Sequence, residues 1–121
     1  MKLAQVARTV NDIARSEEWY RSVLGLRHLY TYGPLAFFEL GGTRLMLSSE
    51  GGAHDGESIL YFEVSDIDAK YRELLSNWVV FRDAPRLIHR HEDGVEEWMA
   101  FFEDLEGRLL ALAAKVVPGE K

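Results

Sequence analysis

The sequence predicts an α+β fold in which two β-α-β-β-β modules in one chain form a curled mixed sheet around a shared cavity. The main observation is an internal repeat, because the segment 10–13 (VNDI) recurs 54 positions later as 64–67 (VSDI). A second echo follows in the same order, since 37–39 and 101–103 both read FFE and lie 64 positions apart. Two echoes in one order indicate that a structural unit has been duplicated.

The remaining observation is a polar, glycine-rich stretch between the two copies. Residues 51–57 read GGAHDGE, a composition typical of a linker. We therefore expect a single domain over all 121 residues, with module 1 at 1–50, the linker at 51–57 and module 2 at 58–117. A chain of this length can bury a core without a disulfide or a metal clip.

Module 1 begins with a strand and a helix. Residues 3–10 alternate and end on β-branched side chains, as a strand does, and Asn11 or Asp12 can cap the helix that follows. Gly25 suits the left-handed position after the helix. One helical face carries the apolar side chains Ile13, Tyr20, Val23 and Leu24. Glycine-containing turns then separate three expected strands, at 26–32, 35–41 and 43–48.

Module 2 repeats this order. A strand at 58–64 leads to a helix that Ser65 or Asp66 can cap. The apolar face of this helix carries Ile67, Tyr71, Leu74 and Leu75. Three more strands are expected near 79–91, 96–103 and 107–115. A four-stranded sheet with one covering helix leaves its other face open, so two such modules can enclose a cavity.

The composition excludes several classes of partner. A formal net charge of −6 argues against nucleic acid or an anionic membrane as the main partner. The sequence has neither a signal-peptide pattern nor an apolar run long enough to cross a bilayer. The absence of cysteine removes thiolate metal sites and thiol chemistry, and it fits the cytoplasm, where we expect the protein.

Two motifs resemble those of a known family, the vicinal oxygen chelate superfamily of glyoxalases, bleomycin resistance proteins and extradiol dioxygenases. Residues 6–26, VARTVNDIARSEEWYRSVLGL, are similar to the family's first strand and helix. Residues 101–112, FFEDLEGRLLAL, are similar to its closing hairpin. The resemblance covers nearly the whole chain. It implies paired modules around a ligand cavity, and commonly a homodimer, for which the open sheet edges leave room.

The resemblance also implies where a metal ion would be held in metal-dependent relatives. They use one side chain on the first and one on the last strand of each module, and the matching positions here are Gln5, Met46, Ile59 and Ala111. Only Gln5 could ligate a hard or borderline divalent ion, through a weak amide oxygen. We therefore expect no metal or other cofactor at these positions, which places glyoxalase, dioxygenase and thiol-transfer chemistry in doubt together.

Strand alternation predicts the side chains that point into the cavity. Taking the ligand positions as inward, the predicted ligand-binding residues are Gln5, Thr9, Arg44, Met46, Tyr61 and Glu63, with Trp98 as an aromatic wall. Arg44 could anchor a carboxylate or phosphate of the ligand, or it could form a structural ion pair with Glu39 or Glu63. The predicted ligand is therefore a small molecule with an anionic group.

Two further interpretations concern catalysis. Glu63 is a candidate general acid or base, although a glutamate on a strand more often lies at a solvated rim. His89 and His91 share one strand face and are candidate metal ligands, with Gln5 as a third weak candidate, but no further ligand is evident at a fixed spacing.

Two functions follow from these residues. The first is a glyoxalase/bleomycin-resistance-like protein that binds a small organic molecule without the family's metal. The second is a lyase, isomerase or dioxygenase of the same superfamily that uses a non-standard metal site or metal-free acid/base chemistry.

Overall fold

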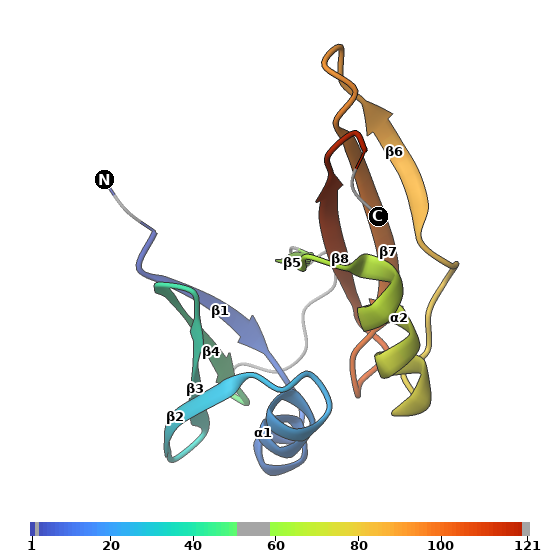
Figure 1. Cartoon of the computed structure of the whole chain (residues 1–121). Helices are drawn as coiled ribbons and strands as arrows, with labels where there is room; N and C mark the ends of the chain where they lie inside the picture. The colour runs from blue at the N-terminus through green and yellow to red at the C-terminus, as the bar shows by residue number, and fades with distance from the viewer. Residues whose placement is uncertain (2, 51–58, 120–121) are drawn as a thin grey trace. The chain divides into compact units, whose positions relative to one another are not determined.

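The computed structural model describes residues 1, 3–50 and 59–119, and the chain divides into two compact units, Met1–Glu57 and Ser58–Lys121 (Figure 1). The linker predicted at 51–57 lies outside the described residues. Each unit has the β-α-β-β-β order that the repeat predicts, and we call the units module 1 and module 2. Both modules contain an unclosed four-stranded mixed sheet and one helix, so the predicted α+β class is confirmed.

The sheet of module 1 has the strand order β1-β4-β3-β2. Its strands are β1 (Gln5–Thr9), β2 (Arg27–Tyr32), β3 (Leu35–Leu40) and β4 (Thr43–Ser48). The first strand runs parallel to β4, and the other neighbours are antiparallel. This pairing places the first and last strands of the module side by side, as the predicted cavity-facing set requires.

Helix α1 (Ile13–Ser22) begins at the predicted cap, where the Asp12 side chain accepts a hydrogen bond from the backbone N–H of Arg15. After the helix, Gly25 has a φ of +72°, the left-handed conformation that glycine adopts without strain. Tyr20 is fully buried, and its ring lies 6.1 Å from that of Phe38 on β3. The predicted apolar face of the helix therefore packs on the sheet.

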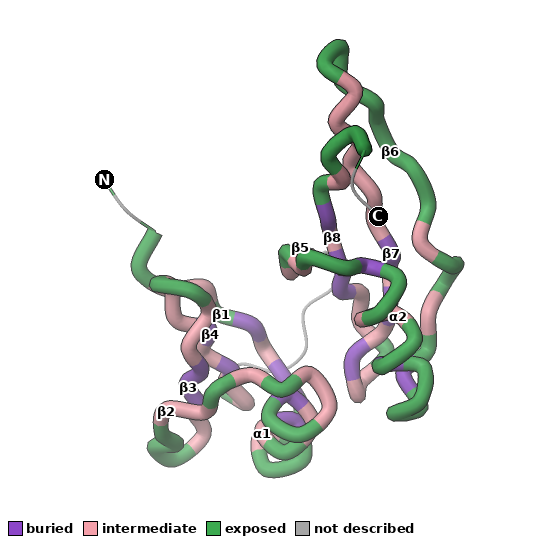
Figure 2. Tube along the Cα trace, in the orientation of Figure 1, coloured by how far each residue is buried: buried purple, intermediate pink, exposed green. Residues whose placement is uncertain are grey.

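One face of the module 1 sheet is covered by α1 and forms the core (Figure 2). Its buried side chains include Val10, Phe38, Leu45 and Leu47, at most 1% exposed. Arg8 shares this face, opposite Leu47, and is only 2% exposed. The opposite face is free of the helix, and we call it the open face.

Module 2 has the equivalent strand order β5-β8-β7-β6. Its elements are β5 (Leu60–Glu63), α2 (Ile67–Ser76), β6 (Arg86–Arg90), β7 (Glu96–Glu103) and β8 (Leu109–Val116). The strand predicted near 79–91 is shorter than expected, because only Arg86–Arg90 pairs regularly with β7. Before it, Phe81 forms an isolated bridge to Phe102, and Pro85 has no N–H to donate to a ladder.

Helix α2 is capped by Asp66, whose side chain accepts a hydrogen bond from the N–H of Ala69. At its other end Trp78 has a φ of +66° and is 91% exposed. This is the only residue other than glycine with a positive φ among those the structure describes. The core of the module lies between α2 and the sheet and includes Leu74, Phe102, Leu110 and Leu112. Neither helix is long and apolar enough to cross a membrane in the described part of the chain.

Candidate functional site

The open face of module 1 carries a group of side chains that the strand register brings together. Gln5 on β1 is opposite Arg44 on β4, and Met46 on β4 is opposite Phe37 on β3. Phe37 is in turn opposite Tyr30 on β2. Residues that face each other in neighbouring strands lie on the same side of a sheet. We call these five residues the Arg44 cluster: Gln5, Tyr30, Phe37, Arg44 and Met46.

The guanidinium of Arg44 is held from two sides. Its Nη2 donates a hydrogen bond to Oε1 of Gln5 at 2.6 Å, and its Nη1 donates to the hydroxyl oxygen of Tyr30 at 3.2 Å. Its Cζ lies 4.7 Å from the centre of the Phe37 ring, within the range of a cation–π contact. The Tyr30 ring stacks on Phe37 at 4.5 Å with an interplanar angle of 26°. Arg44 therefore has a defined position above an aromatic floor.

The amide of Gln5 contacts two members of the cluster. While its oxygen accepts from Arg44, its Nε2 is directed at the sulfur of Met46, 3.7 Å away. A thioether sulfur is a weak acceptor. Gln5 thus uses its strong acceptor on the guanidinium and leaves its N–H₂ group in contact with a weak acceptor only.

The charge of Arg44 is not balanced by a carboxylate within the described part of the chain. Its two hydrogen bonds go to a neutral amide and a neutral hydroxyl. Glu39 is directly opposite Arg44 in the β3–β4 register, but its Oε2 accepts a hydrogen bond from the backbone N–H of Gly42 at 2.6 Å. The interpretation of Arg44 as an ion-pair partner of Glu39 is therefore wrong.

The predicted site residue Thr9 lies on the same face as Gln5, at the far end of β1 and opposite Ser48. Tyr30 and Phe37 were not predicted, although both have a direct contact with Arg44. Counting residues outward from the Gly33-Pro34 turn would have found them, since Tyr32 pairs with Leu35 and the count reaches Tyr30 and Phe37 two pairs later.

The open face of module 2 carries Tyr61 and Glu63, as predicted. Tyr61 is opposite Ala111, which is opposite Phe101, and the rings of Tyr61 and Phe101 meet edge to face at 5.9 Å. Glu63 is opposite Ala113 and is exposed. The structure therefore brings two predicted residues to the open face of module 2 and three predicted residues into the Arg44 cluster.

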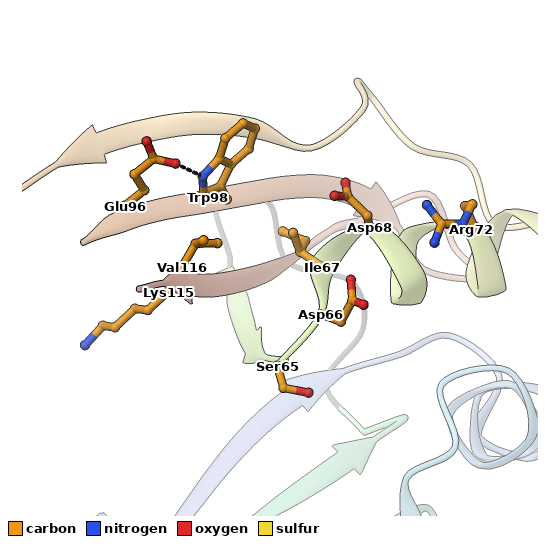
Figure 3. A pocket seen from close by; sticks show the side chains of 9 residues that line it. All are labelled: Ser65, Asp66, Ile67, Asp68, Arg72, Glu96, Trp98, Lys115 and Val116. Carbon is orange, nitrogen blue, oxygen red and sulfur yellow. Dashed lines mark hydrogen bonds between the residues drawn. The ribbon is translucent and has the colours of Figure 1, made fainter. Parts of the chain in front are cut away.

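Trp98 lies on the other face of module 2, so the expectation that it shares a wall with Tyr61 is wrong. Trp98 is opposite Ala114, which alternates with Leu112 and Leu110 on the helix-covered face. Its indole N–H donates to Oε1 of Glu96 at 2.9 Å (Figure 3). Both residues line a cavity of about 620 Å³ beside the first turn of α2. Trp98 is three residues from Phe101, and an odd spacing reverses the face in a regular strand.

His89 and His91 lie on the β6–β7 hairpin, with ring centres 4.5 Å apart. The Nε2 of His91 is 2.6 Å from Oε2 of Glu97, and this hydrogen bond lowers the pKa of the Glu97 carboxyl below its ordinary value. In residues 1, 3–50 and 59–119, no group of three His, Asp or Glu side chains is arranged to hold a metal ion. The non-standard metal site suggested by this histidine pair therefore gains no support.

The residues at the family's metal-ligand positions do not fit a divalent cation. The amide oxygen of Gln5 already faces the positive guanidinium of Arg44, which would repel a second cation. Met46 offers a soft thioether, which suits neither hard nor borderline ions. Ile59 and Ala111 have no ligating side-chain atom, and Ala111 is fully buried.

Comparison with known proteins agrees with this architecture. The family model described as the glyoxalase/bleomycin resistance protein/dioxygenase superfamily matches residues 2–112. The chain belongs to this superfamily. It is 31% identical over 112 residues to the metallothiol transferase FosB of Staphylococcus haemolyticus. This alignment covers 88% of this chain and 78% of FosB. It is 29% identical over 131 residues to the protein YraH of Bacillus subtilis, with coverage of 93% and 97%.

Solved structures of other proteins share this fold. An integron cassette protein from V. cholerae has a TM-score of 0.75 at 19% identity, with 94% of each chain covered. A lactoylglutathione lyase from Agrobacterium tumefaciens has a TM-score of 0.69 at 18% identity, covering 93% of this chain and 92% of that one. These likenesses concern the fold, so function must be argued from the residues of the site.

Proposed function

We propose that this superfamily member binds a small organic molecule that carries a carboxylate, phosphate or related oxyanion, and that it does so without the family's metal ion. In this proposal the ligand lies against the open face of module 1. The anionic group is held by Arg44, and flat parts of the ligand contact the exposed side of Tyr30.

The observation that carries the proposal is the position of Arg44. A guanidinium stays charged at any pH that a protein survives, and it needs an anion if it is to be covered. Here it is fixed by Gln5 and Tyr30, which are both neutral, instead of by a carboxylate. Because Arg44 is already ordered before binding, an anionic ligand loses little free energy to restricting this side chain.

The absence of a metal follows, in this proposal, from the donor set. Ligation by a single amide oxygen beside a guanidinium is too weak to retain zinc, iron or manganese. Glu63 is exposed on the open face of module 2, where water competes with a substrate for its carboxylate. We therefore favour a binding protein over a lyase, isomerase or dioxygenase.

We further propose that the protein acts in the cytoplasm as a homodimer. Each sheet has two edge strands, and such edges are common sites of pairing between copies of a chain. Static light scattering at working concentration should give twice the mass of the chain, and the mass of a single chain would contradict the dimer.

The test of the binding function is calorimetric titration of the full chain with benzoate, benzenesulfonate and phenyl phosphate. We expect at least one anion to bind the wild type, and Arg44→Met to weaken it by on the order of 2 kcal/mol, roughly 30-fold. Arg82→Met removes an exposed arginine of module 2 that pairs with Glu103, and it should leave the affinity unchanged. Equal binding by wild type and Arg44→Met would contradict the proposal, as would the absence of any anion binding.

A further inference from the structure

We infer that Gln5 and Tyr30 are positioning residues that turn the Arg44 cluster into a surface of hydrogen-bond donors, so the head group of the ligand is an oxyanion that only accepts hydrogen bonds. This inference rests on the proposed function and adds two elements to it. It assigns a role to residues that are not themselves charged, and it excludes amines and amides as head groups.

The donors can be counted on Arg44 first. A guanidinium has five N–H groups, and Arg44 uses one on Gln5 and one on Tyr30. The other three N–H groups have no acceptor among the described residues. The guanidinium lies over the Phe37 ring. An acceptor for its three remaining N–H groups must therefore approach from a side that Phe37, Gln5 and Tyr30 do not cover.

The two partners present donors as well. The N–H₂ group of Gln5 faces only the weak acceptor Met46, at 3.7 Å. The hydroxyl oxygen of Tyr30 accepts from Arg44, which leaves its hydrogen for another acceptor. The two strong acceptors of the cluster, the oxygens of Gln5 and Tyr30, both already face the guanidinium. An incoming amine or amide N–H would therefore compete with Arg44 for them, whereas an oxyanion finds several donors.

The role of Gln5 in this arrangement differs from that of its position in metal-dependent relatives. Its side chain holds a permanent cation at 2.6 Å instead of ligating an exchangeable one. An arginine without such a partner has many rotamers, and restricting it before the ligand arrives lowers the entropic cost of binding. The tyrosine ring adds to this restriction, because its stack on Phe37 fixes the hydroxyl.

The experiment uses benzenesulfonate as the probe, since it stays anionic at every pH used and has only acceptors on its head group. Benzenesulfonamide and benzylamine are its matched neutral and cationic analogues. The full chain is titrated in the wild-type, Gln5→Glu, Gln5→Met and Tyr30→Phe forms. Tyr71→Phe is the control, because it removes a tyrosine hydroxyl from helix α2, where the ring packs against Phe81 on the covered side of module 2. Thermal unfolding of every variant is measured in parallel.

Gln5→Glu gives the most discriminating result. The new carboxylate has the shape of the amide and pairs with Arg44, so the melting temperature should stay the same or rise while affinity for benzenesulfonate falls by about 30-fold or more. A residue with a merely structural role would move stability and affinity in the same direction. Gln5→Met and Tyr30→Phe each remove one hydrogen bond to Arg44 and should weaken binding by about 3- to 10-fold. The control should bind like the wild type.

Two results would overturn the inference. One is benzenesulfonate binding that is equal in wild type, Gln5→Glu and Tyr30→Phe, which would show that Gln5 and Tyr30 do not position Arg44. The other is binding of benzylamine or benzenesulfonamide to the wild type as tightly as benzenesulfonate, which would contradict a donor surface. If the wild type binds no anion, the proposed function on which the inference rests is overturned instead.

Discussion

Modules 1 and 2 are similar on the face that their helices cover and different on the face that is open. Both helices are capped by an aspartate, and Phe38 and Phe102 are fully buried at matching positions of β3 and β7. On the open face, the position two residues after the hairpin glycine is Arg44 in module 1 and Leu109 in module 2. Gln5 likewise corresponds to an apolar residue, Ile59.

The two copies of the module therefore differ mainly in the residues of the open face. The helix-covered face determines whether a module folds, so its side chains tolerate little change in volume or polarity. The open face is freer to change, and in module 1 it holds a guanidinium between a neutral amide and a neutral hydroxyl. In our proposal the shared face supports folding, and the open face of module 1 binds the ligand.

The largest expected effects test the shared face. Phe38→Ala and Phe102→Ala each remove a fully buried ring, and each should lower the free energy of unfolding of its module by about 3–5 kcal/mol. Urea unfolding of the two variants measures this directly. A loss below about 1 kcal/mol in one variant only would show that the two cores are not equivalent, contrary to the comparison.

The ends of the helices should give smaller effects of opposite sign. Gly25 and Trp78 both have a left-handed backbone, which an L side chain adopts at a cost of about 1–2 kcal/mol. Trp78→Gly should therefore stabilise module 2 by about 1 kcal/mol, and Gly25→Ala should destabilise module 1 by a similar amount. No atom lies within 4 Å of a Cβ built on Gly25, so its cost is one of backbone strain and not of a clash.

Thermal unfolding of both variants tests this pair of predictions. Destabilisation by Trp78→Gly would mean that the exposed indole makes a stabilising contact that outweighs the strain of its backbone. Such a result would contradict the claim that both helix ends favour glycine. It would not bear on the proposal for the Arg44 cluster.

The smallest effect concerns the β6–β7 hairpin, which extends beyond the point where module 1 turns. The hydrogen bond from His91 lowers the pKa of Glu97, so this contact stabilises the folded state when the carboxyl is ionised. That stability is present above the ordinary carboxyl pKa of about 4.3 and is lost as the pH falls through the lower, folded value. The melting temperatures of wild type and Glu97→Gln should therefore differ at about pH 6 and approach each other as the pH is lowered below about 4.3. A difference that grows on acidification would contradict this sign.

The sequence was sufficient to predict those parts of the fold and site that depend on local alternation. The repeat predicted two modules, and alternation along β1 and β4 placed Gln5, Arg44 and Met46 on one face, because neighbouring strands pair residue by residue. Tyr30 was missed because its position relative to Arg44 follows only from two successive turns, Gly33-Pro34 and Gly41-Gly42, which set the register of β2 with β3 and of β3 with β4.

Other features could not be read from the sequence because they depend on side-chain contacts. The sequence left two candidate carboxylate partners for Arg44, Glu39 and Glu63, or an anionic ligand. Only the structure shows that Arg44 is held by an amide and a hydroxyl. Trp98 was expected on the open face, but the continuous register of β7 and β8 places it with Glu96 under the helix side. Regular pairing of β6 begins at Arg86, directly after Pro85, which has no N–H to donate to the ladder.

The central claim is that Arg44, and not a metal ion, supplies the cation of the site. Its most direct test is calorimetric titration of benzenesulfonate into the full chain after dialysis against EDTA, repeated with one equivalent of zinc added. We expect the same affinity in both titrations, because the guanidinium needs no metal to bind an oxyanion. Binding that is absent after EDTA and appears when zinc is added would contradict the account.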